Sequence, residues 1–141
     1  MFNIQKIRTL TKDLQASEIK AQQYEQVFKA ITNNIAFIEF TPDGTITDAN
    51  TLFQDATGYS LNEIIGQHHR IFCDNSYTST KEYAEFWKTL QAGKSLRGTF
   101  ERFKKSGETL WLEATYFPVK EDNKVIKVLK IANVVTQQKT N

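Results

Sequence analysis

The side chains best suited to chemistry gather in one short stretch, Gln67–Cys73. It holds both histidines of the chain, His68 and His69, and its one cysteine. Imidazole can bind a metal, move protons or hydrogen-bond a ligand near neutral pH. Neighbouring residues on a helix point in directions about 100° apart, so two adjacent histidines make a poor metal pair. We therefore expect His69 to face inward and to bond to backbone or a ligand, and His68 to face solvent.

The rest of the sequence carries no recognisable catalytic motif. It lacks a nucleophile motif, a glycine-rich phosphate loop and a two-cysteine metal pair. Glu101 and Glu113 are expected to be cross-strand neighbours, paired with Arg102 and lysines in a structural role. Cys73 is expected to act as a small buried hydrophobic residue. We therefore expect a binding and signalling module and no enzyme.

Composition and charge exclude further classes of protein. A chain of 141 residues with 40% hydrophobic content predicts one domain with a real core and one appendage. The net charge of +2 argues against a nucleic-acid partner, and Lys127 and Lys130 are expected to be solvated. No apolar run approaches the roughly 20 residues that span a bilayer, and no signal peptide is visible. One cysteine fits a reducing compartment. We expect a cytoplasmic segment without membrane contact.

Short, clearly capped elements surround the histidines. Pro42-Asp43-Gly44 predicts a reversal, because proline presets φ and glycine accepts positive φ. Asn50 is suited to cap a short helix, and Ser79 with Glu82 forms a capping box for a longer one. The expected helices are 50–57, 60–65 and 79–93, with 67–73 as a short helix or loop and 74–78 as a loop.

Five strands are expected, of which the last three are long. Tight turns between these three predict an antiparallel meander. Because helices separate the first hairpin from the meander, the fold class is α+β. The expected strands are 36–40, 45–47, 96–104, 109–120 and 124–135.

The amino-terminal segment, residues 1–31, has a different pattern. Its apolar residues alternate spacings of three and four without glycine or proline, which predicts a dimerising coiled coil. The seam would be formed by Ile7, Leu10, Leu14, Ser17, Ala21, Tyr24, Phe28 and Ile31. The alternative is a single amphipathic helix that folds back on its own domain. The remaining parts are a globular domain at 32–137 and a tail at 138–141.

Together, these motifs resemble a PAS sensor domain over roughly residues 31–137. They are most similar to PAS domains of bacterial chemoreceptor and energy-taxis proteins. The positions that carry the resemblance are Asp43-Gly44, Asn50, Phe53, Gly58-Tyr59-Ser60, Glu63-Ile64, Gly66, Phe86-Trp87, Gly98, Lys105-Ser106-Gly107, Trp111, Pro118 and Thr136. The resemblance implies a five-stranded antiparallel sheet in the order 2-1-5-4-3, with short helices on one face. It also implies a cytoplasmic redox or chemotaxis sensor.

The resemblance further implies partners and a pocket. The partners would be a second copy, bound through the amino-terminal helix and the PAS sheet, and a downstream signalling domain or the chemotaxis machinery. A change in the pocket would pass to the dimeric helix. The cofactor would be a flavin, FAD, with Asn50 at the ring edge and Trp87 against the rings. The residues implied to bind it are Asn50, Phe53, His69, Trp87 and Trp111.

Three other states of the pocket stay open. In light-oxygen-voltage domains, a PAS branch, a cysteine forms a flavin adduct, and His69 stands at that position here. Haem is a further alternative, with His69 or His68 as axial ligand. The pocket can also be filled by side chains, which would make the chain a ligand-free dimerisation module. The sequence departs from flavin-binding PAS domains at Leu96 and Arg102, which replace Trp and Asn, and Val134 replaces a common Asp near the end of the last strand.

Overall fold

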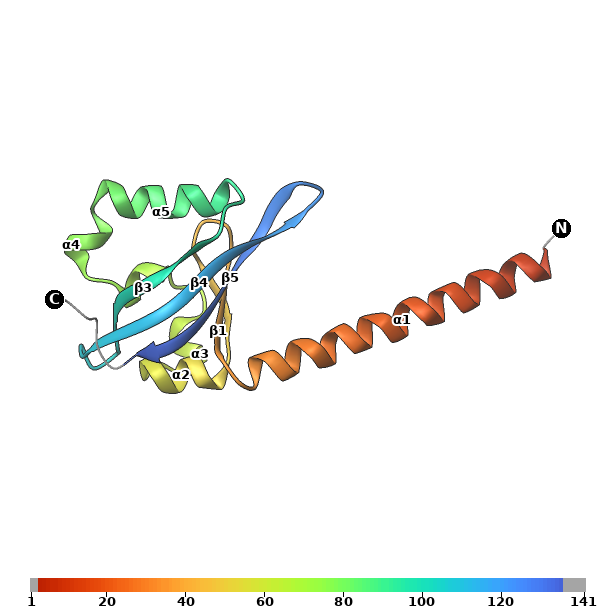
Figure 1. Cartoon of the computed structure of the whole chain (residues 1–141), viewed down its shortest axis with the longest axis horizontal. Coiled ribbons are helices and arrows are strands. Elements are labelled where there is room, and N and C mark those ends of the chain that lie inside the picture. The colour runs from red at the N-terminus through yellow and green to blue at the C-terminus, as the bar shows by residue number, and fades with distance from the viewer. Residues whose placement is uncertain (1–2, 136–141) are drawn as a thin grey trace. The chain divides into compact units, whose positions relative to one another are not determined.

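The computed structural model describes residues 3–135, and its fold is α+β, as expected. Five strands form one antiparallel sheet in the order β2-β1-β5-β4-β3 (Figure 1). This confirms the predicted fold class and strand order. The strands are β1 (Ala36–Phe40), β2 (Ile46–Ala49), β3 (Leu96–Phe103), β4 (Thr109–Glu121) and β5 (Lys124–Val135). The expected tail at 138–141 and Thr136 lie outside the described residues.

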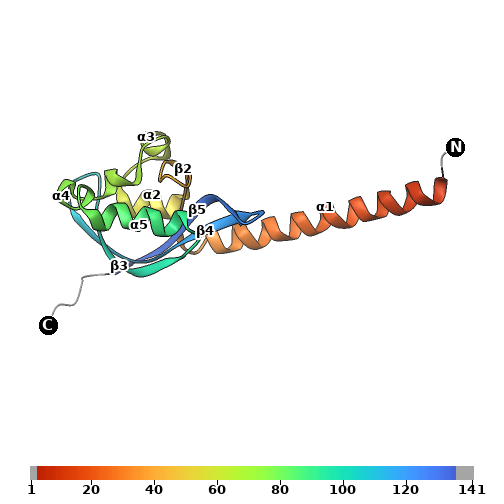
Figure 2. The same ribbon diagram turned by 90° about the horizontal axis from the view of Figure 1, so that it is seen from above.

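Five short helices connect the first hairpin to β3, and Figure 2 shows them over one face of the sheet. They are α2 (Thr51–Thr57), α3 (Leu61–Ile64), the 3-10 helix η1 (His69–Phe72), α4 (Asn75–Thr78) and α5 (Lys81–Gln91). Asn50 caps α2 by accepting a hydrogen bond from Phe53 N at 3.0 Å, as predicted. Gly58, in a left-handed conformation, ends the same helix.

Two local predictions were wrong. The segment expected as a loop at 74–78 forms α4, because the Asp74 carboxylate caps it by accepting from Ser76 N. The cap of α5 is Thr80 and not Ser79, since the Thr80 hydroxyl accepts from Tyr83 N at 3.2 Å. The Ser79 hydroxyl donates to Asn75 O instead.

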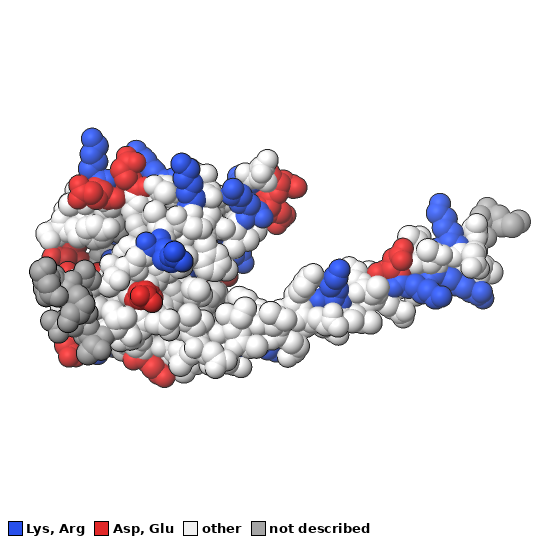
Figure 3. Space-filling model, in the orientation of Figure 1, with Lys and Arg blue, Asp and Glu red and all other residues white. Residues whose placement is uncertain are grey.

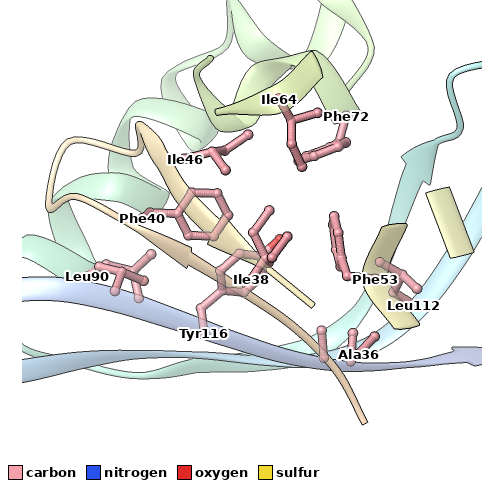
Figure 4. Packing of buried hydrophobic residues seen from close by; sticks show 14 of the residues in the cluster. Ala36, Ile38, Phe40, Ile46, Phe53, Ile64, Phe72, Leu90, Leu112 and Tyr116 are labelled. Carbon is pink, nitrogen blue, oxygen red and sulfur yellow. The ribbon is translucent and has the colours of Figure 1, made fainter. Parts of the chain in front are cut away.

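The core lies between the helices and the inner face of the sheet. Alternate residues of β4, Leu110 to Tyr116, are buried on this face, whereas Glu113 is exposed on the other. Figure 4 shows Ile38, Phe40 and Tyr116 converging from the sheet. Burying each such apolar side chain contributes about 1.5–3 kcal/mol, so the inner face holds the helices in place.

The long helix α1 (Ile4–Thr32) belongs to a separate compact unit. Its 29 residues give a length of about 43 Å. None of them is buried, and Leu10 and Leu14 are 60% and 61% exposed. Most of the stability of helices in proteins comes from the packing of an apolar face, and contiguous exposed apolar surface marks an interaction site. The predicted coiled-coil seam would supply the missing packing.

The visible surface of the globular unit carries charges of both signs. On the side of the globular unit seen in Figure 3, Lys and Arg are interspersed with Asp and Glu. None of the helices between residues 3 and 135 combines the length and the apolar content that crossing a bilayer requires.

The seam of α1 can be tested directly. We expect the double variant Leu10→Glu/Leu14→Glu to convert a dimer into a monomer, because it buries two carboxylates in the seam. Multi-angle light scattering at tens of micromolar protein measures the mass. Thr9→Glu/Gln15→Glu adds the same charge away from the seam and should leave the dimer intact. A wild-type chain that runs as a monomer would contradict the coiled coil.

Candidate functional site

The side chain at the centre of the domain is His69, which has no exposed surface. Its Nδ1 lies 2.8 Å from Tyr83 Oη on α5, and its Nε2 lies 2.8 Å from Tyr116 Oη on β4. A neutral imidazole has one N–H donor and one acceptor nitrogen. One tyrosine therefore donates to the ring and the other accepts from it. Through these two bonds His69 joins η1 to α5 and to the sheet.

Aromatic rings fill the space around this histidine. The ring centroids of Phe40, Trp87 and Tyr116 lie 5.5, 5.4 and 5.5 Å from that of His69. Phe86 stacks on the other side at 5.9 Å. Rings at these separations attract one another in edge-to-face and offset geometries. The His69 ring is thus fixed by packing as well as by hydrogen bonds.

The turn at Gly44 contacts both histidines directly. The His69 N–H donates to Gly44 O at 2.9 Å. Gly44 has φ 95°, and a Cβ there would lie 2.6 Å from His68 Nε2 and 3.0 Å from Trp87. Only glycine suits this position, because both the backbone conformation and the close approach exclude a side chain.

The two histidines divide their roles partly as predicted. His69 is the more buried of the two, which confirms the prediction. The expectation that His68 faces solvent was wrong. His68 is half-buried, its Nε2 lies 2.9 Å from Asp43 O, and its Nδ1 accepts from Arg70 N. His68 therefore fastens the 42–44 turn to η1.

Two buried cations flank Tyr116, and sequence reasoning missed both. Arg102 and Lys130 are 3% and 1% exposed. Arg102 Nη2 donates to Tyr116 Oη at 3.1 Å, and Nη1 donates to Glu101 O at 2.8 Å. Lys130 Nζ lies 4.7 Å from the centroid of the Tyr116 ring. The expected solvation of Lys130 and the pairing of Arg102 with glutamate side chains were wrong.

The signal for these cations was strand alternation. Lys130 lies between Val128 and Ala132, and all three are buried on the inner face of β5. Arg102 occupies the corresponding buried face of β3. Side chains at i and i+2 share a face, so both positions could have been assigned to the interior.

His69, Tyr116, Arg102 and Lys130 form one buried cluster, and burial decides which of them are charged. It lowers the pKa of His69 well below its usual value, and Arg102 and Lys130 add to this effect. Burial also raises the pKa of Tyr116 to about 12, with Arg102 opposing the shift. It lowers the pKa of Lys130 well below its usual value, helped by Arg102. At neutral pH the histidine and the tyrosine are therefore uncharged.

Cys73 lies beside the cluster. Its Sγ is 3.7 Å from His69 Nδ1, and burial raises the pKa of its thiol. A thiol whose pKa is raised is a poor nucleophile. Cys73 was expected to be a small buried residue; it is half-buried and packs against the core.

The five residues implied to bind a cofactor do not all lie together. Phe53 and Trp87 are buried in the same core as His69. The amide of Asn50 is turned to the backbone, accepting from Phe37 N and donating to Ile35 O. Trp111 alternates with the buried residues of β4 and so lies on the opposite face of the sheet.

Replacement of the two histidines should separate their contributions. We expect His69→Ala to lower the free energy of unfolding by about 3 kcal/mol, because it leaves two buried tyrosine hydroxyls short of a partner. His68→Ala should cost about 1 kcal/mol, since it loses bonds at a half-buried position. Urea denaturation measures both, and a larger loss for His68→Ala would contradict the assignment.

The lowered pKa of His69 makes stability depend on pH. Below the ordinary histidine pKa of 6.5, the unfolded chain takes up a proton that the folded chain refuses. Stability is therefore lost as the pH falls from 7 to 5, by up to about 1.4 kcal/mol per unit for one such group. In His69→Gln, which cannot titrate, this slope should be smaller. Equal slopes in urea denaturation of the two proteins would contradict a neutral His69.

Comparison with known proteins places the chain in a family. A family model for the PAS domain matches residues 33–135. The biofilm dispersion protein BdlA of Pseudomonas aeruginosa is 42% identical over 105 residues, which cover 74% of this chain and 25% of that protein. The aerotaxis receptor of Escherichia coli is 28% identical over 93 residues, 66% of this chain and 18% of the receptor. The chain thus spans a quarter or less of the length of both relatives.

A solved structure shares the fold. A light-oxygen-voltage domain studied with a flavin analogue superposes with a TM-score of 0.66 at 24% identity, over 83% of this chain and 89% of that one. The strand order and the helices over one sheet face agree with the family match. Because the family model covers most of the sequence, this chain belongs to the PAS domain family.

Proposed function

We propose that this chain is the sensory module of a bacterial chemotaxis or redox-signalling protein, and that it has no enzymatic activity. The observation that carries the proposal is the buried bridge from Tyr83 through His69 to Tyr116. It joins η1, α5 and β4, so a stimulus that breaks one bond acts on three elements at once. The relatives named for aerotaxis and biofilm dispersion support a sensory role.

The output would pass through a dimeric α1. A stimulus shifts a two-state element only by its differential affinity for the two states. Here the two states would differ in whether Tyr116 keeps its bond to His69. β4 pairs with β5 along most of its length, so a displacement of Tyr116 would reach the outer face of the sheet. A second copy, bound through α1 and this face, would receive the change, and a downstream signalling partner would read it.

A flavin is the ligand that the resemblance implies, and the flavin-analogue work on a similar domain supports it. The side chains in their present arrangement do not fit one. The Asn50 amide is engaged by the backbone, both nitrogens of His69 are engaged by tyrosines, and Trp87 packs against other rings. FAD would therefore have to displace these side chains.

Haem fits the same interior no better. An iron ligand needs one free imidazole nitrogen, and the two nitrogens of His69 lie 2.8 Å from tyrosine hydroxyls. An absorption spectrum of the protein purified with excess FAD or haemin tests both groups. We expect no bound chromophore. A stoichiometric flavin or haem band that survives gel filtration would instead establish that cofactor.

The sensory role is testable through α1. In a Cys73→Ala background, a spin label at Gln23→Cys reports the distance between the two helices of a dimer. We expect His69→Phe, which keeps a ring but removes both hydrogen bonds, to change the distance distribution measured by electron–electron double resonance. The control Lys88→Gln alters an exposed residue of α5 and should change nothing. An unchanged distribution in a folded His69→Phe variant would indicate a passive assembly module.

A further inference from the structure

The buried cluster around Tyr116 holds more hydrogen-bond donors than acceptors. Arg102 donates through Nη1 and Nη2, but its Nε is buried and has no partner among the described residues. The ammonium of Lys130 faces the rings of Tyr116 and Phe53 at 4.7 and 5.7 Å. Within residues 3–135, no ion pair includes either cation. Arg102 is thus left with a buried N–H group that could still donate.

The tyrosines add one more donor, whichever tautomer His69 adopts. If Nε2 carries the proton, Tyr116 Oη accepts from both His69 and Arg102, and its own hydrogen needs another acceptor. If Nδ1 carries the proton, Tyr83 Oη accepts from His69, and the Tyr83 hydrogen is the one in surplus. In both cases the hydrogen bonds of the two tyrosines among residues 3–135 leave one hydroxyl hydrogen available to a further acceptor.

The cluster also carries positive charge, which, like the unused donors, calls for an anionic partner. The buried polar residues of the described chain are Thr57, His69, Arg102 and Lys130, and none of them is acidic. A buried cation without a counter-ion costs several kcal/mol. An anion placed against Arg102 and Lys130 would offset this cost, would favour the charged form of Lys130 against the burial that lowers its pKa, and would accept the surplus hydrogen bonds.

A groove open to solvent reaches Arg102, the member of this cluster that lines it. It lies between α4 and β3 and has a volume of about 340 Å³. Arg102 lines the groove and also bonds to Tyr116, so it belongs to both places. The rings of Tyr77 and Phe100 form apolar walls, 6.0 and 5.0 Å from the guanidinium. Asp74 and Glu101, both exposed, lie along the groove.

We propose that this groove binds a small organic monocarboxylate, with the carboxylate against Arg102 and the apolar body against Tyr77 and Phe100. Lys130, the other cation that contacts Tyr116, is a second source of positive charge. The carboxylate matches a guanidinium that has unused donors. The groove volume suits a small organic acid, and the two acidic residues along it disfavour anions of higher charge. The inference rests on the proposed sensory function, because it names the class of ligand that the module would detect.

Isothermal titration of the full chain tests the site. The probes are benzoate, butyrate and acetate, with benzamide as the uncharged isostere of benzoate. We expect benzoate to bind at least about tenfold more tightly than benzamide. Arg102→Gln and Lys130→Met should each weaken benzoate binding by about tenfold or more, since each removes one charge. Arg97→Gln, at an exposed position on the same strand, should bind as the wild type does.

Lys130→Met provides a second readout that a structural role alone would not give. This variant should unfold at a higher urea concentration than the wild type, because an unpaired buried cation is replaced by an apolar side chain. If Lys130→Met is more stable than the wild type but binds benzoate less tightly, the wild-type lysine serves the ligand and not the fold. Loss of stability in Lys130→Met would overturn this part.

Three outcomes would overturn the carboxylate site without deciding whether the chain has a sensory function. Benzoate binding no tighter than benzamide, wild-type affinity in both cation variants, or no binding of any of the three carboxylates would each do so. If His69→Phe still changes the α1 distances, the sensory proposal survives that failure. If benzoate binds through Arg102 but never changes those distances, the anion site stands and the sensory role fails.

Discussion

The hydrogen bonds of one buried histidine organise the sensor domain. His69 bonds to Tyr83 on α5 and to Tyr116 on β4, and its backbone N–H bonds to Gly44. A buried polar group must keep its partners or cost about 1–3 kcal/mol. The turn, η1, α5 and the sheet are therefore placed with respect to one imidazole, and any stimulus that alters its bonding is felt by all of them.

The second feature of the interior is the positive charge of two basic side chains beside this histidine. Arg102 and Lys130 lower the pKa of His69 further after burial has lowered it. They also stay without a carboxylate partner among residues 3–135. Proteins commonly give up stability at functional sites. A filled aromatic interior with unpaired positive charge is better matched to a small anion than to a large planar cofactor.

Much of the fold could be predicted from the sequence, because turns, helix caps and strand alternation depend on residues that are close together in the chain. Turn residues, caps and alternation gave five strands in the correct places, and the motif order gave the sheet order. The cap of α5 was placed one residue early, since Ser79 and Thr80 are chemically equivalent candidates and only tertiary packing selects between them. The inward position of His69 followed from its neighbours. The burial of Arg102 and Lys130 was not predicted. Charged residues are mostly exposed in proteins, and this general tendency was preferred to the strand alternation that places both on the inner face.

His69 stays neutral while it bridges two tyrosines. Nitrogen-15 NMR of the imidazole in the full chain tests it most directly, because the two ring nitrogens report both protonation and tautomer. A neutral His69 should show one protonated and one unprotonated nitrogen, and should keep both as the pH falls through 6.5, where an ordinary imidazole takes up a proton. A ring that takes up a proton near its ordinary pKa of 6.5 would contradict it.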